Sequence, residues 1–326
     1  MVIENKRKMV NHCRTKLEID GNKIINQKFP VLLSRYLPVS LPNMGKLIFH
    51  SSYYRCSKNP KVKNVITVYD FMYEHYQKGV RKNIHSLQKG LAISIADGII
   101  CISNSTKNDL LRQYPTVDED KIAVIHLGVD QSYFILNKNT VRIPDYISNL
   151  ITQKYILFVS YRGGYKNFKL VVDSLSALHD YKLVLIGGGD LTNEEEALLN
   201  SKVSDRYTHL KIVENTDLNI LYNHAFCLLY PSEYEGFGIP VLEAMQAGCP
   251  VICSATSSIP EVAGKAGLML QQIDARKIIE KIKHLENSEY RNQVIELGLE
   301  QASRFSWDKT YHDTMDFYDK IYSLAK

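Results

Sequence analysis

A thirteen-residue segment, Pro231–Glu243 (PSEYEGFGIPVLE), constrains the fold of this chain more than any other part. It follows Ala225–Tyr230, an apolar run typical of a buried strand, and it leads into a run of helix-favouring residues. Gly236 and Gly238 allow the backbone to pass close to a ligand, and Pro240 suits the first turn of a helix. The segment therefore predicts a strand–turn–helix unit whose backbone N–H groups and helix dipole face an anion.

Two carboxylates flank this turn. Glu235 precedes the glycines and Glu243 lies on the predicted helix, so both can point into one crevice and accept hydrogen bonds from hydroxyl groups. An anion site beside two such carboxylates suits a nucleoside-diphosphate sugar, whereas the alternative is that both are solvated charges at a helix start. Besides Glu243, the residues expected to bind the donor are those of the turn: Gly236, Phe237, Gly238 and Ile239.

The E-x7-E spacing of Glu235 and Glu243, with the string PSEYEGFGIPVLEAMQAGCPVICS, resembles the retaining glycosyltransferases of the family-4 type (glycosyltransferases group 1). The resemblance spans roughly residues 45–326, is strongest from 155 to 265, and points to bacterial surface-polysaccharide mannosyltransferases. It implies the α/β GT-B fold, in which two Rossmann-like domains with parallel sheets face each other. It also implies retaining transfer of a hexose from a nucleotide-diphosphate sugar to a hydroxyl of a glycan or polyprenyl-diphosphate-linked acceptor, without a metal and without a cofactor.

Short apolar runs alternate with helix-periodic segments along the whole chain, which predicts parallel α/β sheets. Strands are predicted at Lys46–His50, Val65–Val68, Gly98–Ser103, Ile122–His126, Tyr155–Val159, Lys182–Ile186, Leu210–Val213, Phe226–Tyr230 and Val251–Cys253. Helices are predicted at His85–Ala96, Ser105–Gln113, Asn167–Ala177, Glu194–Lys202, Leu218–Asn223 and Pro240–Ala247.

A polar, turn-rich seam at Asn137–Gln153 divides the chain. We expect an acceptor-side domain over residues 1–150 and a nucleotide-sugar-binding domain over 151–305. Residues 306–326 form an amphipathic aromatic helix, which the resemblance implies crosses back onto the first domain. The first fifty residues offer only Pro30–Leu33 as an apolar run, so the N-terminal domain is predicted to be abbreviated by about one βα unit.

Arg162 and Lys166 follow the strand that ends near Phe158, on either side of a Gly-Gly turn. Fixed cations aimed at a departing diphosphate lower the barrier directly, and the family's Arg and Lys at these positions are taken to hold it. The alternative is a basic turn that caps a helix. Because Lys166 is predicted to open a helix, where a cation opposes the dipole, a bound anion is favoured there.

A second glycine-rich turn, with Gly187 and Gly188, closes the next predicted strand. It lacks both the dinucleotide fingerprint and the Walker lysine, so it either lines the nucleotide pocket or simply turns the chain.

Tyr69 and Asp70 close the strand that begins near Val65. The family usually has His-Asp here, with the His near the reacting sugar carbon, so Tyr69 is a departure from its pattern. A phenol donates a hydrogen bond but does not titrate near pH 7. Asp70 is expected to orient a neighbour, and His75 or His50 to approach the same space or to serve the structure alone.

Three further polar clusters have simpler interpretations. Asp118–Asp120 has the D-x-D form of a metal site but does not close an apolar strand, so we interpret it as a solvated turn and predict no metal site. Asn104 or Ser105 is expected to cap a helix, with a contact to acceptor or phosphate as the alternative. Glu261 matches the family and also suits a helix N-terminus.

The composition is that of an ordinary globular protein of 326 residues, 45% hydrophobic and 23% charged. No stretch of about eighteen apolar residues is present, and no apolar run follows the N-terminal charges, so neither a spanning helix nor a signal peptide is expected. Six scattered cysteines favour a reducing cytoplasmic compartment.

The two halves of the chain differ in charge. Residues 1–150 carry 22 Lys and Arg against 12 Asp and Glu, whereas residues 151–326 carry 18 against 23. Nothing resembles a nucleic-acid module. The basic half is either a solvated surface or one that faces an anionic membrane, which would place the protein at the inner face of the membrane.

The residues and the resemblance together favour a retaining hexosyltransferase over two rivals. One is another enzyme, a nucleotide-sugar epimerase or a phosphorylase, and the other is a binding-only subunit that needs a catalytic partner. Glu243 would bind the ribose and Glu235 the sugar hydroxyls, and the leaving phosphate would help to take the proton. The residues expected to act at the reacting centre are Glu235, Arg162, Lys166, Asp70 and Tyr69.

Overall fold

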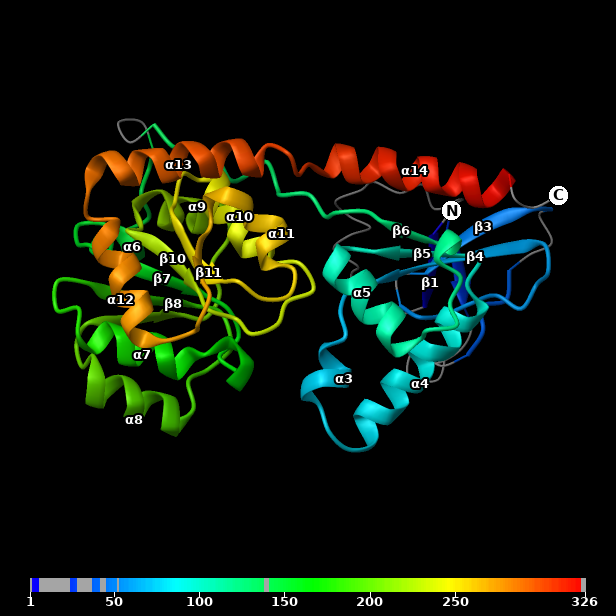
Figure 1. Ribbon diagram of the computed structural model, residues 1–326, viewed down its shortest axis with the longest axis horizontal. Helices are drawn as coiled ribbons and strands as arrows, with labels where there is room; N and C mark the ends of the chain where they lie inside the picture. The colour runs from blue at the N-terminus through cyan, green and yellow to red at the C-terminus, as the bar shows by residue number, and fades with distance from the viewer. Residues whose placement is uncertain are drawn as a thin grey trace.

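The computed structural model describes residues 2–5, 24–27, 37–41, 45–51, 53–137 and 141–323. Two α/β lobes lie side by side and are bridged along one edge by the last two helices (Figure 1). Within the described ranges, no helix combines the length and the apolar character needed to cross a bilayer.

The C-terminal lobe is built on a six-stranded parallel sheet with the order β12-β11-β10-β7-β8-β9. This is the doubly wound order, in which the chain runs outward from β7 in one direction and then returns to start again at β10. The crevice at the carboxyl ends of β7 and β10 is therefore the switch point where ligands bind in such sheets. The strands are β7 Tyr155–Val159, β8 Lys182–Ile186, β9 Tyr207–Leu210, β10 Cys227–Tyr230, β11 Val251–Ser254 and β12 Leu268–Leu270.

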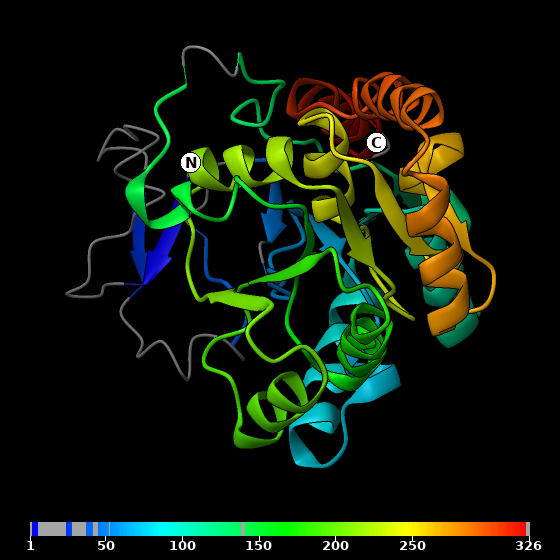
Figure 2. The same cartoon turned by 90° about the vertical axis from the view of Figure 1, so that its left-hand side faces the viewer.

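Side chains of this sheet alternate between two apolar layers, as the period of two along a strand requires. On β7, Tyr155 and Leu157 face the layer under α9, α10 and α11, whereas Ile156 and Phe158 face α7, α8 and α12. Figure 2, seen from this lobe, shows α9 on one side of the sheet and α7 and α8 on the other. The helices are α7 Phe168–Ser176, α8 Asn193–Lys202, α9 Asn215–His224, α10 Ile239–Gln246, α11 Ile259–Ala263, α12 Ala275–His284 and α13 Ser288–Ala302.

The N-terminal lobe carries a four-stranded parallel sheet with the order β3-β4-β5-β6, and β1 and β2 form a separate parallel pair. Helices α3, α4 and α5 belong to this lobe, and α4 packs against β4 through buried Ala92 and Ile93. Its elements are β1 Val2–Asn5, β2 Ile24–Gln27, β3 Leu47–Ser51, β4 Val62–Val68, α3 Met72–Tyr76, α4 Val80–Ile95, β5 Gly98–Cys101, α5 Asn104–Gln113 and β6 Ile122–Val124.

The last helix, α14 (Trp307–Ser323), lies on the N-terminal lobe although it follows the C-terminal one (Figure 1). Phe317 and Ile321 pack in one apolar cluster with Val65 and Ile100 of the four-stranded sheet. Gly98 permits this contact, because a Cβ there would lie 2.9 Å from the Ile321 side chain. Burial of two large apolar side chains, each contributing about 1.5–3 kcal/mol, holds α14 on this lobe.

Several predicted elements are corrected by the structure. The strand predicted at Leu210–Val213 is wrong, because β9 ends at Leu210 and 211–213 turn into α9. Strand β12 and helices α12 and α13 were missed, as were β1 and β2 within the first fifty residues, where no strand was expected before Lys46. The apolar run Pro30–Leu33 lies outside the described residues.

Candidate functional site

The Lys166–Glu235 pair lies at the switch point of the six-stranded sheet. Lys166 comes from the turn after β7 and Glu235 from the turn after β10, and Lys166 Nζ forms an ion pair with Glu235 Oε1. Both side chains are largely buried, with exposed fractions of 9% and 13%. The ammonium also lies 5.1 Å from the ring of Tyr165 and 5.4 Å from that of Tyr230, whose hydroxyl hydrogen-bonds Glu235. A buried cation and a buried carboxylate are thus brought together where the fold places a ligand.

The local backbone around Lys166 differs from the prediction. Residues Gly164–Lys166 form a 3₁₀ turn, Asn167 adopts a left-handed conformation with φ of 56°, and α7 begins only at Phe168. Lys166 therefore precedes the helix instead of opening it, and its charge is balanced by Glu235. The prediction that Lys166 opens the helix was therefore wrong.

Arg162 is held by the second glycine turn. Its guanidinium donates to the carbonyls of Gly187 at 2.7 Å, Gly188 at 3.2 Å and Asp190 at 2.9 Å, and its Nε lies 3.1 Å from the Glu195 carboxylate. Gly188 must be a glycine, because its φ is 76° and a Cβ would lie 2.4 Å from Arg162 Nη1. Arg162 and the turn thus form one unit, and in the described part of the chain Arg162 is not bonded to Lys166 or Glu235.

The Gly236 turn touches the N-terminal lobe at Tyr69 and Asp70. A Cβ on Gly236 would lie 2.1 Å from the Tyr69 carbonyl oxygen and 3.0 Å from Asp70 Cβ. Thr106 Oγ1 donates toward the Gly236 carbonyl at 3.3 Å. Tyr69 remains about half exposed, and the Asp70 carboxylate accepts from the Met72 N–H at 3.0 Å. The two residues predicted at the end of β4 are thus brought to the glutamate segment.

The helix cap of α5 also differs from the prediction. Ser103, rather than Asn104 or Ser105, is the N-cap, and its hydroxyl accepts from the Thr106 N–H. Asn104 instead donates from its backbone and its side chain to Glu261 across the lobe interface, at 3.0 Å and 2.6 Å.

Glu261 therefore has structural partners in the other lobe, since His126 Nε2 also lies 2.6 Å from its carboxylate. Burial alone would raise the pKa of Glu261, but the hydrogen bonds from His126 and Asn104 outweigh burial and lower it. This carboxylate remains ionised near neutral pH and ties the N-terminus of α5 to the C-terminal lobe.

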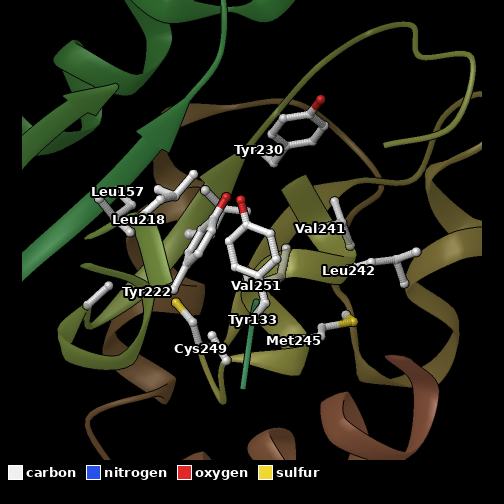
Figure 3. Packing of buried hydrophobic residues seen from close by; sticks show 14 of the residues in the cluster. Tyr133, Leu157, Leu218, Tyr222, Tyr230, Val241, Leu242, Met245, Cys249 and Val251 are labelled. Carbon is white, nitrogen blue, oxygen red and sulfur yellow. The ribbon is translucent and has the colours of Figure 1, made fainter. Parts of the chain in front are cut away.

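Glu243 lies on α10 with two buried tyrosines around it. Tyr222 of α9 donates to Glu243 Oε2 at 3.1 Å, and Tyr133 hydrogen-bonds the same carboxylate from the segment that joins the lobes. Figure 3 shows the two phenol oxygens side by side, and the rings meet edge to face with centroids 5.9 Å apart. Burial raises the pKa of Glu243 to about 6, against the lowering effect of these two hydroxyls.

Tyr133 and Tyr222 were not predicted from the sequence. The segment bearing Tyr133 is fastened to α9, because the Phe134 N–H donates to Asn219 at 3.1 Å and the Leu136 N–H to Asn223 at 2.8 Å. The only sequence signal is a pair of asparagines four residues apart on a predicted helix, which places two amides on one face.

Serines and one tyrosine support the Gly236 turn. Ser258 donates to the carbonyls of Glu235 at 2.9 Å and Phe237 at 2.8 Å. Tyr234 reaches the other lobe, where its hydroxyl donates to Asp109 at 2.9 Å and accepts from the Phe71 N–H. The backbone N–H groups of Gly236, Phe237 and Gly238 donate to no group in the described residues, and Gly238, with φ of 108°, is the N-cap of α10. The turn thus presents its N–H groups at a helix N-terminus.

The remaining predicted residues lie elsewhere. His50 contacts Tyr318 of α14 and Thr67, and burial lowers its pKa. His75 is at the lobe interface, 3.7 Å from Asp109. Asp118–Asp120 precedes β6 on the surface, and no cluster of three or more His, Cys, Asp or Glu suited to a metal ion is found among the residues that the structure describes.

Two family models match this chain, one over each lobe. Residues 146–317 match the model of the glycosyl transferases group 1 family, and residues 46–133 match the Glycosyltransferase Family 4 model. O-antigen chain mannosyltransferase B of Escherichia coli is 28% identical over 97% of this chain and 86% of the relative. O-antigen chain mannosyltransferase RfbU of Salmonella typhimurium is 28% identical over 70% of this chain and 62% of the relative.

Among solved structures, sucrose-phosphate synthase from Thermosynechococcus elongatus aligns with a TM-score of 0.67 at 20% identity, over 81% of this chain and 69% of that one. This likeness bears on the fold alone, and it agrees with the two parallel-sheet lobes. The family match covers more than half of the residues. The chain therefore belongs to the glycosyl transferases group 1 family and is a glycosyltransferase of the GT-B type.

Proposed function

We propose that this enzyme transfers a hexose, with mannose as the first candidate, from a nucleoside-diphosphate sugar to a hydroxyl of a glycan or lipid-linked glycan, with retention of configuration. The mannose assignment is supported by the two O-antigen mannosyltransferases that resemble this chain. In this proposal residues 1–150 form the acceptor side, 151–305 the donor side, and 306–326 the helix that joins them.

The Lys166–Glu235 pair is the observation that carries the proposal. An ion pair with both members nearly buried is costly unless each charge finds further partners. A nucleoside-diphosphate sugar supplies those partners, because its diphosphate binds an ammonium and its hexose hydroxyls donate to a carboxylate. We assign the diphosphate to Lys166 and to the N–H groups of Gly236, Phe237 and Gly238, and the hexose to Glu235.

Glu243 is assigned to the nucleotide ribose, with two tyrosine hydroxyls to orient it. A carboxylate offers about four acceptor positions, so two phenols leave room for two ribose hydroxyls. Arg162, Gly187 and Gly188 line the same side of the crevice as one unit, and we assign Arg162 to shaping this turn.

The acceptor hydroxyl is assigned to the side of Tyr69 and Asp70. Attack on the face that the leaving group departs from would explain retention, and a phosphate oxygen of the donor would take the proton. A side chain with a pKa near 7, which could act as a base, is then not required at the position of Tyr69.

A panel of GDP-, UDP- and dTDP-sugars tests this function. We expect one class of donor to raise the melting temperature and to be hydrolysed slowly without acceptor, with activity retained in EDTA. A chain that binds no nucleotide sugar, or that binds one without any turnover when lipid-linked glycan is supplied, would contradict the proposal. Formation of an epimerised nucleotide sugar would favour the epimerase instead.

A further inference from the structure

Helix α4 presents a continuous apolar face to the outside of the N-terminal lobe. Five residues at the spacing of one helix face are largely exposed: Val80 at 72%, Ile84 at 45%, Leu87 at 66%, Leu91 at 54% and Ile95 at 48%. We call this set the α4 apolar stripe. Single exposed apolar residues are ordinary, but five in line on a sixteen-residue helix mark a surface that contacts something apolar.

The other side of α4 is firmly packed, so the stripe does not arise from a loosely held helix. Ala92 and Ile93 lie in the core of the lobe. Lys89 is fully buried, forms an ion pair with Glu74 at 2.8 Å and donates to the Asp70 carbonyl at 2.9 Å. These contacts fix the orientation of α4 about its axis, with the stripe on the outer side of the lobe.

Basic residues outnumber acidic ones around the stripe. No Asp or Glu occurs from His75 through Ala96, and Lys78 and Arg81 are exposed at the start of α4. Toward the other end, a hollow of about 690 Å³ lies between α4 and residues 54–60. Leu91 and Ile95 line it on the side of the stripe, together with exposed Lys58. Asp97 also lines this hollow, where its carboxylate is paired with Lys63 at 2.8 Å.

We propose that the α4 apolar stripe docks the N-terminal lobe on the surface of an anionic lipid bilayer. Branched apolar side chains on one helix face, with an excess of basic residues beside them, are the composition that inserts at a lipid interface. Lys78 and Arg81 would lie at the level of anionic headgroups. A second copy of the chain suits this surface less well, because a two-fold contact between two stripes would bring like charges together.

The location of α4 gives this docking a consequence for the acceptor. Helix α3 lies between α4 and the other lobe (Figure 1). The ring centroid of its Tyr76 is 4.6 Å from that of Tyr165, the neighbour of Lys166. A bilayer under α4 would therefore lie near the mouth between the lobes, where a lipid-linked acceptor would arrive. Only this link to the acceptor rests on the proposed function, whereas the docking rests on the surface.

Flotation with vesicles tests the docking without any substrate. Vesicles of phosphatidylcholine alone are compared with vesicles containing about one third phosphatidylglycerol, at low salt and at about 1 M salt, where screening extends over only about 3 Å. We expect binding to the anionic vesicles only, with a marked loss at high salt. Leu87→Gln with Leu91→Gln should weaken binding about tenfold or more, since a buried leucine contributes that factor or more.

Matched control substitutions test whether vesicle binding depends on the stripe or on any exposed apolar residue. Ile212→Gln alters a residue that is 87% exposed on the other lobe, and its vesicle binding should equal that of the wild type. Val80→Gln with Ile84→Gln is a second, independent pair on the stripe. Circular dichroism and nucleotide binding should be unchanged in every variant, so a failure of the proposed function would appear there and not in flotation.

The proposal is overturned if the wild type does not bind anionic vesicles or if both pairs of substitutions leave binding intact. It is also overturned if the wild type is a dimer that the stripe substitutions convert to a monomer with vesicle binding unchanged, because the stripe would then be an interface between copies.

Discussion

Tyr222→Phe removes one hydroxyl from the carboxylate that we assign to the donor ribose. Tyr222 is fully buried on α9, and its hydroxyl donates to Glu243 Oε2 at 3.1 Å. The pKa of Glu243 is raised by burial to about 6 while this bond opposes the rise. Phenylalanine keeps the ring and its packing but removes the donor, so the pKa of Glu243 should rise further and the carboxylate should be less available near neutral pH.

The size of the effect follows from the strength of the lost bond. A hydrogen bond to a charged acceptor contributes about 1.5–3 kcal/mol, and a change of one in pKa corresponds to about 1.4 kcal/mol. With the lower bound, the pKa rises by about one. If only the ionised form binds the ribose, affinity for the nucleoside diphosphate should fall about fivefold at pH 6, about twofold at pH 7 and little at pH 8.

Titration calorimetry with the nucleoside diphosphate at these three pH values measures this change. Tyr155→Phe is the matched control, because Tyr155 is equally buried in the same lobe but donates to the Leu221 carbonyl at 2.6 Å. An affinity loss of the same size at every pH, or an equal pH-dependent loss in the control, would refute the reasoning.

Four further outcomes are expected. Lys166→Ala should weaken nucleoside-diphosphate binding by about 1.5–3 kcal/mol in a folded protein, measured by calorimetry, and an unchanged affinity would remove its role. Glu235→Ala should lower kcat strongly with nearly unchanged binding of the free nucleoside diphosphate, because it is placed on the hexose; an effect on binding alone would contradict this. Gly236→Ala should lower stability by about 1–3 kcal/mol and reduce activity, because its Cβ would overlap the Tyr69 carbonyl; urea unfolding tests it, and a wild-type midpoint would contradict the contact. The raised pKa of Glu243 contributes about 2 kcal/mol to the free energy of unfolding below its ordinary pKa of 4.5, and this contribution is lost as the pH rises through about 6. Melting temperatures of the wild type should therefore fall over this pH range, and those of Glu243→Gln should lack that fall.

The fold could be predicted where the signal is local. Buried parallel strands such as β7 and β8 are continuous apolar runs, and their positions were predicted to the residue because burial on both faces leaves no room for polar side chains. Strand β9 was misplaced by three residues, since its residues Tyr207–Leu210 are only half-buried at the edge of the sheet and include Thr208 and His209. Strand β12 is three residues long and gives too short a pattern to detect.

The candidate site was also predictable in part, because some of its residues follow strands that have a clear local signal. Lys166 and Glu235 lie in turns directly after strands, and the doubly wound order brings the ends of those strands together. Arg162 was expected to face the diphosphate, but the sequence does not show that four carbonyls of the next turn surround its guanidinium. Such a contact depends on where two loops meet, and it has no period along the chain.

The sequence by itself determined the strand–turn–helix unit, the spacing of Glu235 and Glu243, and the alternation of strands and helices, because these depend on backbone propensity and on burial over a few residues. Only the tertiary structure decided that Tyr133, from the segment between the lobes, reaches Glu243, and that Asn104 meets Glu261 across the interface. Each of these contacts joins residues more than one hundred positions apart. Their formation depends on how the two sheets and α14 pack, a property of the whole chain that no local pattern encodes.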